Sequence, residues 1–224
     1  MDNHFETGLD ELRQKLLTMA SHAETAVNRA VQALVQRDAD LANRVKEDDR
    51  VIDHFEIEID EFAIQLLTKA PLATNLRMVT VAMKISQDLE RIGDEASKIA
   101  RRARDLALEP PIKLNLDLPR IAALALDMLK AALDAFVNRD STAARAVIPR
   151  DKEVDALNKH IHNLLAQYMV ENPSVIGCCL HWMVASKSIE RIADHATNVA
   201  EDVVYLCEAL DIRHSGMKSQ PVPA

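Results

Sequence analysis

Two short acidic motifs, one hundred residues apart, carry the clearest chemical signal in the sequence. Glu90 and Asp94 have the spacing Glu-x-x-x-Asp, and Glu190 and Asp194 repeat it. Residues four apart lie on one face of an α-helix, so each motif directs two carboxylates toward one place. Carboxylate oxygens are ligands for metal ions. The spacing therefore predicts that each motif helps to bind a cation.

The residues around the motifs are repeated as well. Residues 88–103 align with 188–203 without a gap, and the identities include Ala96 with Ala196 and Ala100 with Ala200. Amphipathic helices that are alike by chance repeat their apolar positions but do not need to repeat their acids. We infer that the chain is an internal duplication.

A second set of acids precedes each motif. Asp49 and Asp53 recur at an offset of 102 as Asp151 and Asp155. If antiparallel neighbouring helices turn these faces toward the motifs, the carboxylates repel one another unless an ion lies between them. Glu56 and Asp60 continue the first face, and Asn158 and His162 stand at the equivalent positions. The predicted metal ligands are Glu90, Asp94, Glu190, Asp194, Asp49, Asp53, Asp151 and Asp155.

A plainer interpretation competes with metal binding. Acid pairs on solvated helix faces are common, and Arg91 and Arg191 are placed to neutralise the motifs in salt bridges. The duplication favours the metal, because the acids recur in both copies. The copies are not identical, since Lys98 stands where the second has Asn198. We therefore expect two sites that bind unequally.

Helical periodicity accounts for most of the chain. Apolar residues recur in steps of three and four, strand-like runs are absent, and prolines mark the ends of the segments. The expected helices cover about 8–36, 38–69, 72–108, 118–137, 141–170 and 172–210, and Pro149 is expected either to kink the fifth of these helices or to close its first stretch. The predicted fold is all-α, with two tandem three-helix bundles related by internal duplication. The expected boundaries are a first repeat at 1–109, a linker at 110–117, a second repeat at 118–212 and a disordered tail at 213–224.

Composition narrows the classes of function. The chain has 224 residues and only four glycines, and neither a P-loop nor a dinucleotide-binding turn can be written from them. A net charge of −8 argues against a general nucleic-acid-binding surface. The first residues do not resemble a signal peptide, and no apolar run approaches the roughly 20 residues of a membrane span. We expect a cytoplasmic protein with three reduced cysteines.

An enzyme is the competing class. A carboxylate-bridged di-metal oxidase in a helical bundle uses Glu-x-x-His pairs, and no glutamate stands three residues before any histidine of this sequence. His195 directly follows Asp194 and therefore points away from the ligand face, which favours a surface or interface role. A metal-free helical scaffold is the remaining alternative.

The two Glu-x-x-x-Asp motifs, the run Glu-Arg-Ile-Ala-Asp-His-Ala-Thr-Asn-Val-Ala-Glu-Asp at 190–202 and the paired triple-helix layout resemble the PhoU family. The resemblance covers about residues 5–212. It implies metal ligands at Glu90, Asp94, Glu190 and Asp194, whereas the four aspartates of the preceding helices follow from the expected facing geometry. One departure is Gly93, which stands where the second copy has Ala193.

The resemblance also implies a function. A member of this family is expected to be a non-enzymatic, cytoplasmic and often dimeric regulator that binds divalent or trivalent metal ions, with iron, zinc, manganese and magnesium as candidates. It would act between the ATPase subunit of the phosphate ABC transporter and a membrane sensor histidine kinase. There it would signal phosphate sufficiency, repress phosphate-starvation genes and limit phosphate uptake.

Overall fold

The computed structural model describes residues 3–68 and 73–213, and within them it contains helices and no strand. In chain order the elements are α1 (Asn3–Gln36), α2 (Ala39–Leu67), α3 (Ala73–Ala107), α4 (Leu118–Asn138), α5 (Ser141–Val147), η1 (Ile148–Arg150), α6 (Asp151–Glu171), η2 (Pro173–Val175) and α7 (Ile176–Glu208). The prediction of an all-α fold with two tandem three-helix bundles is confirmed. In the second bundle, the middle helix is the series α5, η1 and α6.

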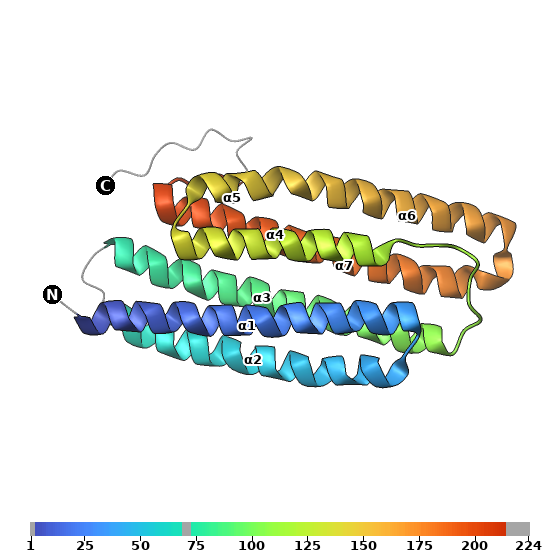
Figure 1. The fold of residues 1–224 in the computed structure, drawn as a ribbon, viewed down its shortest axis with the longest axis horizontal. Coiled ribbons are helices and arrows are strands. Elements are labelled where there is room, and N and C mark those ends of the chain that lie inside the picture. The colour runs from blue at the N-terminus through green and yellow to red at the C-terminus, as the bar shows by residue number, and fades with distance from the viewer. Residues whose placement is uncertain (1–2, 69–72, 214–224) are drawn as a thin grey trace.

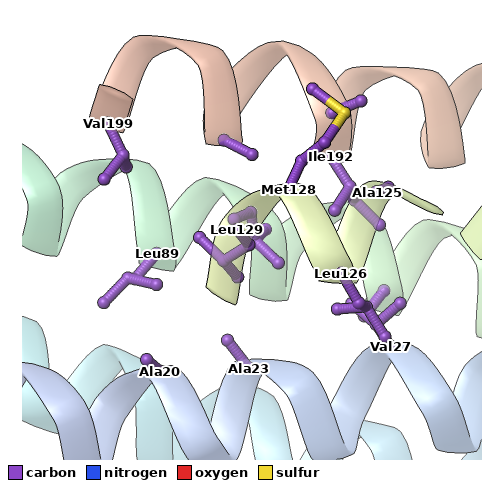
Figure 2. Packing of buried hydrophobic residues seen from close by; sticks show 14 of the residues in the cluster. Ala20, Ala23, Val27, Leu89, Ala125, Leu126, Met128, Leu129, Ile192 and Val199 are labelled. Atoms are coloured by element: carbon purple, nitrogen blue, oxygen red, sulfur yellow. The ribbon is translucent and has the colours of Figure 1, made fainter. Parts of the chain in front are cut away.

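The two bundles lie side by side (Figure 1). Helices α2 and α6 lie at opposite edges, and α1, α3, α4 and α7 lie between them. Helix α3 packs against α7 about as extensively as the helices within the first bundle pack against one another, and α1 also contacts α4. Buried side chains from all four of these helices belong to one hydrophobic core (Figure 2). The repeats are therefore joined through packed side chains and not only through the linker.

The same turn occurs once in each repeat and shows the duplication in atomic detail. Arg37 and Arg139 both have a left-handed backbone, with φ of 57° and 52°. Asp38 then accepts a hydrogen bond from the backbone N–H of Leu41, and Asp140 accepts from the N–H groups of Thr142 and Ala143. Each aspartate satisfies donors that the first turn of a helix leaves free. The offset of 102 inferred from the sequence thus relates two helix caps of the same kind.

Proline sets the breaks between helices. Of the two outcomes expected at Pro149, the structure has the second, because α5 ends at Val147 and a 3₁₀ turn over Ile148–Arg150 leads into α6. A proline ring cannot donate the helical hydrogen bond and clashes with the preceding turn. The expected stop at Pro71 lies outside the described residues, and so does the predicted tail except for Arg213.

None of the described helices contains an apolar stretch long enough to cross a membrane.

Candidate metal-binding clusters

The first acidic cluster forms where α2 packs against α3. Asp49, Asp53 and Glu56 come from α2, and Glu90 and Asp94 come from α3. Asp49 is near enough to Asp53 and Asp94 to feel their charge, and Glu90 feels Asp94, Glu56 and Asp53. The facing geometry expected from the sequence therefore brings carboxylates of two helices into one electrostatic group. We call these five residues the α2/α3 cluster.

Burial and mutual repulsion both act on the α2/α3 cluster. Burial is the larger cause that raises the pKa of Asp49, Glu56 and Glu90 above the ordinary carboxyl values, and repulsion from neighbouring carboxylates raises each pKa further. A hydrogen bond with Ser97 lowers the pKa of Asp49. Like charges held this close favour either proton or cation binding, because either would relieve the repulsion.

Arg91 supplies part of the compensating charge in the α2/α3 cluster. Its guanidinium lies 3.5 Å from Glu90 Oε2 and 3.5 Å from Asp94 Oδ2. The Arg91 side chain is 54% exposed, so water screens both pairs. The salt bridges considered as the plainer interpretation are therefore present in the first repeat.

Gly93 allows the two helices of the first cluster to approach. A Cβ at this position would lie 2.9 Å from Ile52 Cδ1 and 3.3 Å from Asp49 Oδ1. Ile52 is fully buried, so its terminal methyl group would have to shift within a close-packed core. The difference between Gly93 and Ala193 that the sequence shows therefore has a steric basis, which is the close contact of α2 with α3 beside Asp49.

The second acidic cluster forms where α6 packs against α7. It contains Asp151 and Asp155 from α6 with Glu190 and Asp194 from α7, and we call it the α6/α7 cluster. Burial raises the pKa of Asp151 to about 6, and the charges of Asp194, Asp155 and Glu190 add to the increase. Burial and the charge of Glu190 also raise the pKa of Asp194. The structure thus brings all four expected residues of this repeat together.

Three buried side-chain oxygens among the described residues of the second repeat have no hydrogen-bond partner, namely Asp151 Oδ1, Glu190 Oε2 and Thr197 Oγ1, although Glu190 forms an ion pair with Lys187. The equivalents of Asp151 and Thr197 in the first repeat, Asp49 and Ser97, are hydrogen-bonded to each other. A buried carboxylate oxygen without a partner costs free energy, so a ligand that contacts it stabilises the fold. This open acceptor fits a cation bound between α6 and α7.

The carboxylates do not form a ready ligand shell. Within residues 3–68 and 73–213, no three His, Cys, Asp or Glu side chains are arranged so that they could hold an ion as they stand. An ion would therefore require these side chains to rotate toward a common point. Carboxylates at the surface of a helix bundle have that rotamer freedom, since their χ angles occupy several staggered wells.

Other polar positions on the same helix faces already have protein partners. Asn158 is buried, and its Oδ1 accepts a hydrogen bond of 2.5 Å from Ser186. His162 Nε2 lies 3.2 Å from the carbonyl oxygen of Met183. His195 Nδ1 lies 2.8 Å from Asp88 Oδ1 across the α3–α7 contact, as expected for an interface histidine. These three side chains therefore form polar contacts between neighbouring helices.

Sequence reasoning missed two residues that act on the clusters. Lys187 forms an ion pair with Glu190, and Ser97 hydrogen-bonds Asp49. Ser97 could have been found, because a hydroxyl recurs at Thr197 in the repeat alignment. Lys187 has Gln87 as its counterpart, so the duplication provides no signal for it.

Comparison with known proteins places the chain in a family. The family model for the PhoU domain matches twice, at residues 16–103 and 118–203. The PhoU homolog of Pseudomonas aeruginosa, described as a phosphate-specific transport system accessory protein, is 40% identical over 219 residues, which is 97% of this chain and 90% of that protein. The accessory protein PhoU of Escherichia coli is 34% identical over 217 residues, with 96% and 90% covered.

Solved structures agree with the sequence relatives. The crystal structure of PhoU from Pseudomonas aeruginosa has a TM-score of 0.88 and 40% identity, and covers 92% of this chain and 100% of that one. The phosphate transport system regulatory protein PhoU from Streptococcus pneumoniae has a TM-score of 0.87 and 25% identity, with 93% and 99% covered. The chain, with one match of the family model in each of its repeats, belongs to the PhoU family.

Proposed function

We propose that this protein is a metal-binding cytoplasmic regulator of phosphate uptake and of phosphate-starvation signalling. The observation that carries the metal part is the convergence of mutually repelling carboxylates, several of them partly buried, in two equivalent places, at α2/α3 and at α6/α7. The relatives' description as phosphate-specific transport system accessory proteins supports the regulatory part.

The metal has a structural task in this proposal. An ion in the α2/α3 cluster would be held by Glu90 and Asp94 with Asp49 and Asp53, and one in the α6/α7 cluster by Glu190 and Asp194 with Asp151 and Asp155. Divalent or trivalent ions suit such oxygen ligands, and iron, zinc, manganese and magnesium are the candidates. Each ion would tie the edge helix of a bundle to the central helix and fix the surface that partners contact.

Elemental analysis of protein purified without a metal-binding tag tests the ligand assignment. We expect bound metal in the wild type. Two double variants remove one motif each, Glu90→Ala with Asp94→Ala and Glu190→Ala with Asp194→Ala. Each should lose the metal that its own cluster binds and keep the metal of the other cluster. The matched control is Asp127→Ala with Asp134→Ala, which removes two exposed acids from α4. Metal content that is unchanged in both cluster variants would refute the assignment.

The regulatory part of the proposal concerns partners. We infer that the protein acts as a homodimeric adaptor between the ATPase subunit of the phosphate ABC transporter and a membrane sensor histidine kinase, and that it represses the phosphate regulon. Pull-down of the metal-loaded protein with each purified partner tests this role. Contact with neither partner, in the presence of metal and in its absence, would contradict the adaptor.

A metal-free scaffold is the second candidate, and one observation favours it. Arg91 and Lys187 already neutralise part of each cluster. If these cations were sufficient, neither addition nor chelation of metal would alter the melting temperature. A bound ion must raise it, because a ligand that binds only the folded state stabilises that state.

A further inference from the structure

A pocket of about 290 Å³ lies between α2 and α3, next to the α2/α3 cluster. Its polar walls come from Asn43, Lys46 and Asp49 on α2 and from Ser97, Arg101 and Arg104 on α3, and Ala42 and Ala100 also line it. Three cationic side chains thus surround one small cavity in a chain whose net charge is −8.

The cations of this pocket are not used in salt bridges. Among the described residues, Lys46, Arg101 and Arg104 each have no carboxylate within ion-pair distance, and Arg104 donates only a 3.3 Å hydrogen bond to Asn43 Oδ1. Arg102, which lies between them in the sequence, is different. It is directed to the other side of α3, where it pairs with Asp105 at 3.1 Å and contacts His181.

We propose that this pocket binds a phosphate-class oxyanion, a tetrahedral ion with two negative charges. Arginine guanidinium groups present paired N–H donors that match such oxygens, and lysine supplies a compact charge. The Asn43 amide adds a neutral hydrogen-bond donor, whereas the Ser97 hydroxyl already donates to Asp49. The small side chains of Ala42 and Ala100 take up little of the space between the helices. A volume of about 290 Å³ lies at the lower end of the range for small-ligand pockets and leaves room for an anion with several waters.

Asp49 gives the pocket a means to discriminate. Its carboxylate is an acceptor on the wall of a cavity that is otherwise lined by donors and cations. Hydrogen phosphate carries a proton that can be donated to this carboxylate, whereas sulfate carries none at neutral pH and would face it with unpaired oxygens. We therefore expect phosphate to bind more tightly than sulfate.

The second repeat lacks the pocket's cations. The equivalents of Lys46, Arg101 and Arg104 are Ile148, Glu201 and Val204. Arg145 stands at the position of Asn43 and pairs instead with Glu208 at 2.6 Å. The proposal therefore predicts one oxyanion for each chain. The site rests on the pocket itself, and only the choice of orthophosphate as the first ligand rests on the proposed function.

Equilibrium dialysis of the full-length, metal-depleted protein with radiolabelled orthophosphate tests the site. We expect saturable binding of one ion for each chain. The triple variant Lys46→Gln, Arg101→Gln and Arg104→Gln should weaken binding by about tenfold or more, because charge-assisted hydrogen bonds are lost. The matched control is Arg44→Gln, an exposed cation on α2 outside the pocket, which should change the affinity less than about twofold. Melting curves verify that the variants are folded.

The other arms of the experiment identify the source of the anion. Sulfate should compete poorly with orthophosphate. If ADP competes as well as orthophosphate, and this competition is lost in the triple variant, the ligand is a phosphate ester. If ADP does not compete, the ligand is the free ion. Absence of saturable binding, or equal loss in Arg44→Gln and the triple variant, would overturn the proposal. Metal content is measured on untreated protein of the same preparation, so failure of the metal sites and failure of this pocket are told apart.

Discussion

The two acidic clusters arise from equivalent positions, but the protein compensates their charges differently. In the α2/α3 cluster, Arg91 lies 3.5 Å from both motif acids, and a hydroxyl contacts Asp49. In the α6/α7 cluster, Arg191 lies 3.5 Å from Glu95 of the other repeat, and Lys187 pairs with Glu190 instead. Asp151 keeps an oxygen without a partner and has a pKa of about 6. Duplication thus preserved the acids, while the surrounding cations diverged.

The largest expected effect is that of a bound metal ion. An ion at one hundred times its Kd stabilises the fold by about 2.7 kcal/mol, and this corresponds to a rise of about 5–10 °C in Tm for a chain of this size. Calorimetry with and without a chelator measures the rise. We expect each double cluster variant to keep only the contribution of the other cluster. If neither metal nor chelator changes the Tm of the wild type, the clusters do not bind metal and the predicted difference between their variants disappears.

The packing beside each cluster gives the next effect. Relative to Gly177→Ala, whose Cβ would meet no atom within 4 Å, we expect Gly93→Ala to lose about 1–3 kcal/mol of unfolding free energy through overpacking. The second repeat pairs Ala193 with Val154, which stands at the position of Ile52 and has one carbon fewer. The added change Ile52→Val should therefore recover most of the loss.

Denaturant unfolding of the single and double variants measures this coupling. If the effects of Gly93→Ala and Ile52→Val simply add, the steric account of the difference between the repeats is wrong.

The pH dependence distinguishes Asp151 from its counterpart. Its folded pKa of about 6 lies above the ordinary value of 3.8, so the folded state binds the proton more tightly than the unfolded state. In metal-free protein this lowers the stability as pH rises from about 4 to 6, and the cost is complete above that range. We expect Asp151→Asn to stabilise metal-free protein at pH 8 by about 1 kcal/mol, less than the full shift implies because solvent screens a half-buried group.

Unfolding by urea at pH 5 and pH 8 is the measurement for Asp151→Asn. The matched change Asp49→Asn should stabilise less, because Ser97 already hydrogen-bonds that carboxylate. If the two variants gain the same unfolding free energy, the carboxylates of Asp151 and Asp49 do not differ in what their charge costs the folded state.

The smallest effects concern the cations. Arg91→Gln and Lys187→Gln should each change the unfolding free energy by less than about 1 kcal/mol, since partly exposed ion pairs are screened. Each should raise the metal affinity of its own cluster, because a competing positive charge is removed. Arg191→Gln is the control, as this side chain pairs with Glu95 and not with a motif acid. Titration of metal into the three variants measures these affinities. An unchanged metal affinity in Arg91→Gln or Lys187→Gln would show that this side chain does not compete with the metal.

The fold and the cluster residues could be predicted from the sequence because they depend on local rules. Helical periodicity, proline breaks and the repeated acids are all visible in the linear chain. The partners of Arg191 and His195 and the place of Lys46 in a pocket could not be predicted, since they depend on which helix packs alongside. Periodicity identifies the face of a helix but not its neighbour, so the contact between α3 and α7 and the pocket between α2 and α3 required coordinates.

The contact between α3 and α7 has a consequence for communication. Each cluster takes its Glu-x-x-x-Asp motif from one of these two helices, and Asp88 with His195 and Lys84 with Asp202 clasp them at 2.8 and 2.9 Å. If ions occupy both clusters, a shift of α3 against α7 would change the geometry of both sites, and by thermodynamic reciprocity binding at one cluster would then change the affinity of the other to the same extent.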